Sequence, residues 1–176
     1  MPTLSLEDLV QRNIDYAPSH TPMPTLEEAA AAGGDMECTL VITCVDFRVR
    51  VEEMLQLNAQ DKVLVCRNPG GRVAAAMEQI MLFKVFLSLK RIVVIHHSDC
   101  GASHFKDHLI REALLNQHPD HPEIENMVFG SFDNLEQGVR DDLEVLKNSP
   151  FVPEELKEQC FGYTYDIKTG LLSPVH

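Results

Sequence analysis

The chain has 176 residues, about the length of one domain, and 44% of them are hydrophobic, which is enough to bury a core. Its 27 acidic residues outnumber the 15 basic ones, so the formal net charge is -12. Because so negative a surface repels nucleic-acid phosphates and anionic lipids, we expect neither nucleic acid nor a membrane as a partner. The five cysteines lack the spacing of a disulfide framework, and no basic residue precedes Arg12, so we expect no secretory leader and a reducing, cytoplasmic location.

Residues 1–34 are predicted to form a helical arm, separate from an α/β catalytic domain at 35–176. Ser5 is the expected N-cap of a first helix, with acidic residues in the first turn. Apolar residues then follow at helical spacing, at Leu6, Leu9, Val10 and Ile14. Thr25 to Glu28 has the pattern of a capping box before an alanine run, which Gly33 and Gly34 are expected to end. Such helices cannot bury their apolar faces alone, so they either fold back on the core or pack on another subunit.

The body alternates between strand and helix patterns. Short apolar, β-branched runs predict strands at 40–44, 62–66, 91–96 and 160–166, and helical patterns occur at 49–57, 73–89 and 134–148. The helix at 73–89 is apolar nearly all round, so we expect it to be buried. After 166 the chain is expected to turn back through 168–172. This order predicts an α/β fold with a mainly parallel sheet flanked by helices.

Two of the predicted strands end in residues that bear unusual chemistry. The first ends in Cys44-Val45-Asp46-Phe47-Arg48, and the third in His96-His97-Ser98-Asp99-Cys100. Because the carboxyl ends of parallel strands share one edge of a sheet, we expect Cys44 to lie near His97 and Cys100. Two thiolates and an imidazole suit zinc, and three protein ligands leave a fourth position open, which is typical of a catalytic site.

Asp46 and Arg48 are two residues apart and share a face of an extended strand, where the arginine can hold the carboxylate. A carboxylate held in this way can accept a hydrogen bond from water on the metal. A buried cysteine is often a simple hydrophobe, and a strand-end histidine such as His96 is often merely hydrogen-bonded. The joint occurrence of these residues at one edge favours a metal site. The remaining cysteines are expected to be structural thiols: Cys38, Cys66 and Cys160.

The paired motifs, in this order, resemble those of the β-class carbonic anhydrases. The resemblance runs from about residue 38 to the C-terminus, and Arg67-Asn68-Pro69-Gly70-Gly71 is similar to the family's Arg-Asn-Ala-Gly segment. It implies that Asp46 and Arg48 form the catalytic dyad. It also implies that each chain binds one Zn2+ through Cys44, His97 and Cys100.

The resemblance further implies an activity and an assembly. The expected reaction is reversible hydration of CO2 to bicarbonate by hydroxide on the zinc. Members of the family work as dimers or larger assemblies in which N-terminal helices reach over a neighbour, so a homodimer or homotetramer is expected. The compact branch also includes hydrolases of carbonyl sulfide (COS) and carbon disulfide. Zinc-dependent hydrolysis of COS to hydrogen sulfide and CO2 is therefore the main alternative.

Three residues depart from the family pattern and bear on the substrate. Phe47 stands where many members carry a small residue, Pro69 replaces the common alanine, and Ala102 stands where a larger residue is frequent. A phenyl ring beside the dyad either reshapes the pocket or points away from it. These departures affect the choice of substrate and leave the expected metal site unchanged.

More distant alternatives are a zinc-binding interaction module and a cysteine phosphatase. The module would need Asp46 as a fourth ligand. The phosphatase rests only on the spacing from Cys44 to Arg50, and the charge of Asp46 would repel its substrate. His104 and His108 are candidates for exporting the proton, although a surface histidine usually has no such role. Gly70-Gly71-Arg72 allows either an anion cradle or close helix packing, and packing is favoured because no phosphate-loop motif is present.

Overall fold

The computed structural model describes residues 3–31, 33 and 37–176. The chain divides into an N-terminal unit, Met1–Asp35, and a body, Met36–His176. The domain boundary predicted at 34/35, the end of the alanine run at Ala32, and Gly34 all lie outside the described residues. Within the described residues, none of the helices is both long and apolar enough to cross a membrane.

The N-terminal unit contains α1 (Leu6–Tyr16), a short 3-10 turn and α2 (Leu26–Ala31). The predicted caps are confirmed, because the backbone N–H groups of Ser5 and Asp8 each donate to the other residue's side chain. Thr25 and Glu28 make the same reciprocal pair ahead of α2. None of the described residues of α1 is buried, and its apolar stripe is more than half exposed, at Leu6, Leu9, Val10 and Ile14.

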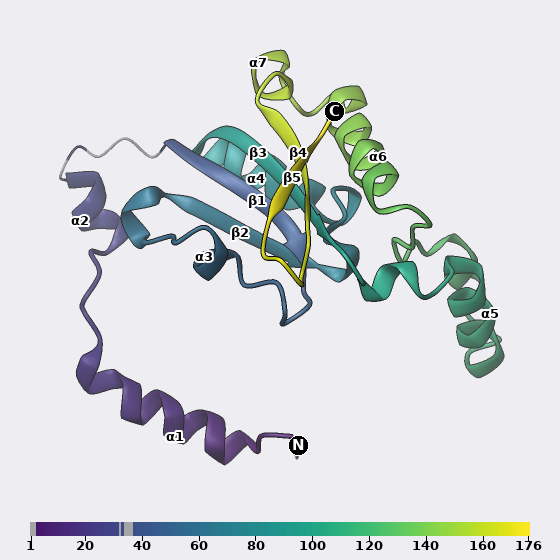
Figure 1. The fold of residues 1–176 in the computed structure, drawn as a ribbon, viewed down its shortest axis with the longest axis horizontal. Helices are drawn as coiled ribbons and strands as arrows, with labels where there is room; N and C mark the ends of the chain where they lie inside the picture. Colours follow the sequence, from purple (N-terminus) through teal and green to yellow (C-terminus); the bar gives the residue numbers. More distant parts are fainter. Residues whose placement is uncertain (1–2, 32, 34–36) are drawn as a thin grey trace. The chain divides into compact units, whose positions relative to one another are not determined.

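The body is built on one sheet in the order β2-β1-β3-β4-β5 (Figure 1). Its strands are β1 (Glu37–Cys44), β2 (Val63–Asn68), β3 (Ser88–His97), β4 (Cys160–Tyr165) and β5 (Leu172–Val175). The first four run parallel, and β5 returns antiparallel to β4. The predicted α/β class, the parallel core of the sheet and the final turn back are therefore confirmed.

The helices of the body are α3 (Val51–Met54), α4 (Met77–Phe86), α5 (Asp107–Gln117), α6 (Leu135–Asn148) and α7 (Glu154–Lys157). Asn134 caps α6 by accepting a hydrogen bond from the backbone N–H of Gln137 at 2.9 Å. This helix packs closely against β4, where a Cβ atom at Gly162 would lie 2.4 Å from the side chain of Val139. Only glycine at that position allows the helix to lie so near the sheet.

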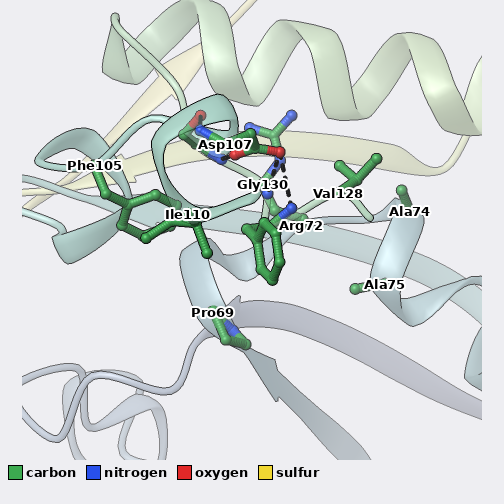
Figure 2. Close-up of a pocket in the computed structure, with 11 residues that line it drawn as sticks. Pro69, Arg72, Ala74, Ala75, Phe105, Asp107, Ile110, Val128 and Gly130 are labelled. Atoms are coloured by element: carbon green, nitrogen blue, oxygen red, sulfur yellow. Dashed lines mark hydrogen bonds between the residues drawn. The ribbon is translucent and has the colours of Figure 1, made fainter. Parts of the chain in front are cut away.

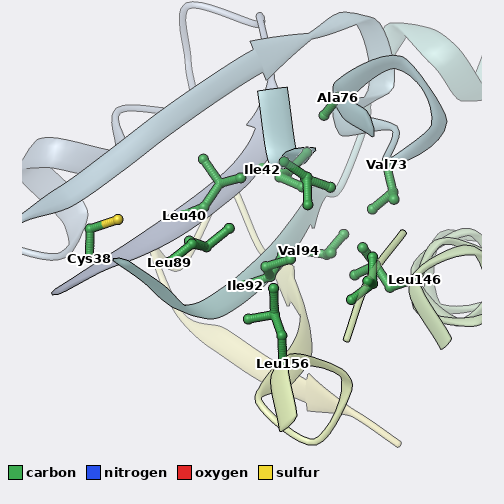
Figure 3. Close-up of a cluster of buried hydrophobic side chains, with 12 residues drawn as sticks. Cys38, Leu40, Ile42, Val73, Ala76, Leu89, Ile92, Val94, Leu146 and Leu156 are labelled. Atoms are coloured by element: carbon green, nitrogen blue, oxygen red, sulfur yellow. The ribbon is translucent and has the colours of Figure 1, made fainter. Parts of the chain in front are cut away.

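The core lies on both faces of the sheet. On one face, Leu40 and Ile42 of β1 pack with Ile92 and Val94 of β3 under α4, α6 and α7 (Figure 3). The opposite face buries Val41 and Ile95 with residues around α3. Alternation of β-strand side chains explains how adjacent residues supply both clusters. Burial on both faces accounts for the continuous apolar runs in the sequence.

Two helix predictions were wrong in extent or burial. The helix expected at 49–57 is confined to Val51–Met54, and the one expected at 73–89 becomes a 3-10 turn followed by α4, because Ser88 already starts β3. In α4 only Ile80 is buried, while Val85 is 88% exposed and Phe86 is 66% exposed. One side of α4 faces the sheet, and the described residues of this chain leave its other apolar side uncovered.

Candidate metal centre

The ends of β1 and β3 bring the three predicted ligands together. The two strands are parallel neighbours, with Thr43 paired to Ile95 just before the ends. Cys44, His97 and Cys100 follow, each no more than 5% exposed, and one ligand atom from each lies within 4.8 Å of the others. The two Sγ atoms are 3.7 Å apart. No second cluster of this kind occurs in the parts of the chain that the structure describes.

The two thiols titrate as a pair. Contact with Cys100 lowers the pKa of Cys44, and His97 and the backbone N–H groups of Asp46 and Gly70 act in the same direction. The hydrogen bond with Cys44, followed by burial, in turn raises the pKa of Cys100. Two thiolates this close are stable together only with a positive charge between them, which a divalent cation supplies.

The ring of His97 presents an unpartnered nitrogen to the two thiols. Nδ1 lies 3.0 Å from the carbonyl oxygen of Ser98, so a proton on Nδ1 donates to that oxygen. Nε2 is then an acceptor, and it is buried without a hydrogen-bond partner. A buried acceptor without a partner costs free energy, and a metal ion would satisfy it. Two sulfurs and one oriented imidazole nitrogen are a donor set that fits zinc.

Asp46 is held against this group by Arg48. Arg48 Nη2 donates to Asp46 Oδ2 at 2.7 Å, and Arg48 Nε and the backbone N–H both reach Oδ1, at 3.0 and 2.9 Å. These hydrogen bonds lower the pKa of Asp46 to about 2, against the opposing effect of burial. Asp46 Oδ2 also lies 3.8 Å from the free Nε2 of His97. An ionised carboxylate of fixed orientation therefore stands beside the candidate metal position.

Comparison with known proteins agrees with this geometry. A family model described as carbonic anhydrase matches residues 39–172. The chain belongs to the β-class carbonic anhydrase family. The resemblance stated from the two motifs is thereby confirmed, and so is the expectation that the chain belongs to a family of enzymes.

The relatives that match this β-class family member include proteins named as carbon disulfide hydrolases and proteins named as carbonic anhydrases. A carbon disulfide hydrolase of Saccharolobus solfataricus is 30% identical over 158 residues, which cover 77% of this chain and 76% of that protein. β-Carbonic anhydrase 1 of Mycobacterium tuberculosis is 25% identical over 173 residues, 96% of each chain. The crystal structure of a carbonic anhydrase from Streptococcus mutans superposes with a TM-score of 0.80 at 27% identity, covering 100% of both chains.

In this family member, Asp99 takes part in the site although the sequence analysis gave it no role. Its carboxylate accepts a hydrogen bond from Arg48 Nη1 at 2.7 Å, and its backbone carbonyl accepts one from Nη2 at 2.8 Å. Asp99 has a φ of +54°, a left-handed conformation that aspartate adopts more readily than most residues. The signal available in the sequence was a short carboxylate directly before Cys100, at a tight turn. Arg48 is therefore anchored on two sides, by Asp46 and by Asp99.

His96 points away from the metal-binding group and belongs to a separate buried cluster. Its Nε2 lies 2.9 Å from Asp142 Oδ2, and Arg72 Nε lies 3.3 Å from the same oxygen. Asp142 Oδ1 also accepts the backbone N–H of Val73 at 3.0 Å. Asp142 was not predicted from the sequence, although its position between Val139 and Leu146 places it on the apolar side of α6. The cluster ties the segment after β2 to the end of β3.

The glycine segment after β2 packs closely on the end of β1. Gly71 has a φ of +70°, and a Cβ atom there would lie 2.9 Å from the backbone carbon of Thr43 and 3.0 Å from the nitrogen of Cys44. Any side chain at Gly71 would push the segment away from the strand that carries the first thiol. The structure thus favours close packing over an anion cradle.

An apolar hollow lies outside the metal-binding group. It has a volume of about 590 Å³ and is lined mainly by apolar groups, including Phe105, Ile110 and Val128 (Figure 2). Asp107 shapes one wall, because its carboxylate accepts the backbone N–H groups of Phe129 and Gly130 at 2.8 and 3.4 Å. None of the three candidate metal ligands lines this hollow, so it is not where the proposed chemistry takes place.

Proposed function

We propose that this chain is a zinc-dependent carbonic anhydrase that reversibly hydrates CO2 to bicarbonate. Cys44, His97 and Cys100 are the proposed zinc ligands, one ion per chain, and Asp46 and Arg48 the proposed catalytic dyad. The observation that carries the proposal is the buried, unpartnered Nε2 of His97 beside two thiols and an arginine-held carboxylate. Zinc held by these three ligands would lower the pKa of a water molecule and so supply hydroxide near neutral pH.

The protein's own groups set the direction of attack. Asp46 is ionised at any pH near neutrality, because Arg48 holds its pKa at about 2. It therefore accepts a hydrogen bond from the attacking oxygen and orients a lone pair toward the carbon of the substrate. Arg48 uses its fork to stop the carboxylate from rotating. Since both oxygens of Asp46 are engaged by Arg48, the carboxylate acts as an orienting group in this conformation.

Hydrolysis of COS or carbon disulfide is the second candidate for the same site. It is favoured by the similarity to a carbon disulfide hydrolase over 77% of the chain. The side chain of Phe47 is 88% exposed, so within this chain it does not narrow the site against a larger sulfur atom. The same three ligands and the same dyad would serve, because each substrate is a linear molecule with an electrophilic central carbon.

Paired kinetics on one preparation test both candidates. The protein is loaded with zinc, its zinc content is measured, and initial rates are recorded with CO2, COS and carbon disulfide. We expect CO2 hydration to be the fastest reaction and to scale with zinc content. Faster turnover of COS or carbon disulfide would show that the chain is a hydrolase of that substrate and not a carbonic anhydrase. A zinc-loaded protein inactive on all three would contradict the proposal as a whole.

Assembly and location complete the proposed function. The exposed apolar stripes of α1 and α4 favour a homodimer or homotetramer over a monomer. All five cysteines are free thiols, which favours a reducing, cytoplasmic location. Cell fractionation with an antibody to the protein tests the location, and recovery in an oxidising compartment would contradict it.

A further inference from the structure

Hydration of CO2 releases one proton for each bicarbonate formed, and this proton must leave the site before the next turnover. Asp46 is poorly suited to accept it, because both of its oxygens already accept hydrogen bonds from Arg48. A group that changes charge near neutral pH and also reaches solvent is better suited. Outside the ligands and the dyad, the structure connects one such group to the site.

A line of hydrogen bonds runs from the dyad to the protein surface. Arg48 bridges Asp46 and Asp99, with Nη2 2.7 Å from Asp46 Oδ2 and Nη1 2.7 Å from Asp99 Oδ2. The other oxygen of Asp99 lies 3.1 Å from Nε2 of His104. The His104 side chain is 67% exposed. One end of the line is therefore beside the candidate metal position, and the other end is open to buffer.

The backbone holds His104 close to the site. His104 follows a 3-10 turn, Gly101–Ser103, that starts directly after Cys100, and its N–H donates to the carbonyl of Gly101 at 2.9 Å. Ser103 Oγ closes the same turn on the carbonyl of Cys100 at 2.8 Å. These two hydrogen bonds hold the turn in place. They therefore fix the backbone position of His104, a few residues after the proposed ligand Cys100.

Asp99 also sets which ring nitrogen of His104 is free. The Asp99 carboxylate accepts a hydrogen bond from Arg48 Nη1 on one oxygen, so its other oxygen is held as an acceptor facing the His104 ring. The Nε2–H of the neutral imidazole donates to it, and the lone pair then lies on Nδ1. Of the charged side chains in the described residues, Asp99 is the one that contacts the His104 ring.

We propose that His104 relays the proton from the site to solution and that Asp99 is the positioning residue for its ring. Water in the site loses a proton, which passes through solvent to Nδ1 of neutral His104. The resulting imidazolium gives that proton to a buffer base, and the neutral ring returns. No bond to carbon changes in this step. The proposal rests on the proposed carbonic anhydrase function.

His108 is the natural comparison, because the sequence offers both histidines. It is exposed near the start of α5, and none of the described hydrogen bonds or ion pairs joins its ring to Asp99 or Arg48. The two rings thus share chemistry and exposure, while only His104 is connected to the dyad. The pair therefore provides a matched test.

Oxygen-18 exchange between CO2 and water at equilibrium tests the relay. This experiment gives the rate of CO2–bicarbonate interconversion and, separately, the rate of release of labelled water, which needs a proton. In zinc-loaded His104→Ala we expect water release to fall about tenfold or more, with interconversion changed much less and imidazole buffer restoring release. His108→Ala should change neither rate. Equal loss of both rates, or no loss of either, in His104→Ala would overturn the relay.

Ring nitrogen resonances test the positioning contact without any activity. In 15N-labelled zinc-loaded protein, Asp99→Asn should shift the His104 ring signals and leave those of His108 in place. Asparagine suits this test because it also tolerates a left-handed backbone. Unchanged His104 signals would show that the contact is absent in solution. A wild-type protein with no interconversion at all would instead refute the proposed function, so the two failures are distinguishable.

Discussion

Asp46 accepts hydrogen bonds from three nitrogen atoms of Arg48, and these contacts determine what its carboxylate can do. Both oxygens are engaged, at 3.0 and 2.7 Å from the side-chain nitrogens, so the group is oriented before any substrate arrives. An orienting carboxylate contributes to turnover and not to metal affinity. A fourth metal ligand would contribute to both, as the interaction-module alternative requires.

Replacing Asp46 separates these roles. In Asp46→Ala we expect zinc content equal to that of the wild type and a loss of CO2 hydration of about 100- to 1000-fold, because the attacking oxygen loses its acceptor. Zinc analysis by mass spectrometry and stopped-flow kinetics check both points. Asp120→Ala, in an exposed loop, is the control and should match the wild type. Loss of zinc and of folding in Asp46→Ala would favour a structural metal site instead.

At the residue scale, the sequence predicted contacts that follow from strand ends and missed those that depend on backbone detail. The meeting of Cys44 with His97 and Cys100 required only that two parallel strands end at one edge. The role of Asp99 depends on a left-handed φ and on the second nitrogen of an arginine fork, and its one sequence signal, a short carboxylate beside a cysteine, specifies neither of them. Asp142 had a readable signal, a carboxylate on an apolar helix face.

At the scale of elements, one carboxylate at the start of α5 holds the segment 129–131 in place. Asp107 accepts the backbone N–H groups of Phe129 and Ser131 at 2.8 and 2.9 Å, and so fixes the segment that walls the hollow in Figure 2. Burial alone would raise the pKa of Asp107, but the hydrogen bonds from Ser131, Phe129 and Gly130 outweigh it and lower the pKa to about 2.

This pKa gives a prediction for acid stability. A depressed pKa in the folded state stabilises the fold above the unfolded value near 4, and the contribution is lost as pH falls toward 2. The shift from 3.8 to about 2 corresponds to about 2 kcal/mol for this largely buried side chain. The advantage of the wild type over Asp107→Asn in urea unfolding should therefore shrink by that amount between pH 5 and pH 2.

The control for this series is Asp120→Asn, because Asp120 lies in an exposed loop after α5 and none of the described hydrogen bonds or ion pairs involves its carboxylate. Its difference from the wild type should not vary with pH. A difference between the wild type and Asp107→Asn that stays constant from pH 5 to pH 2 would show that the loop contacts do not hold the carboxylate ionised.

The burial of α4 shows where sequence patterns fail at this scale. An apolar pattern predicts that a helix is buried on several sides, but it does not indicate whether the burying residues belong to the same chain or to another. The body covers Ile80 and leaves Leu82, Val85 and Phe86 exposed. The strands were easier to predict, because both faces of the sheet are covered by segments of the same chain.

At the scale of the whole molecule, the uncovered apolar faces predict self-association. In light scattering we expect a mass of at least two chains. Val85→Glu places a charge on the exposed side of α4 and should lower the mass toward one chain. Gln117→Glu adds the same charge at an exposed position of α5 and should not. A monomeric wild type, or a Val85→Glu protein of unchanged mass, would show that α4 is not an interface.

The central claim concerns one zinc ion held by two sulfurs and one imidazole. X-ray absorption at the zinc edge of purified, active protein tests it most directly, because it identifies the atoms around the metal. We predict two sulfur neighbours at about 2.3 Å and two lighter neighbours, one zinc per chain, with the sulfur signal halved in Cys44→Ser. Full activity in protein free of zinc, or a zinc ion without sulfur neighbours, would contradict the account.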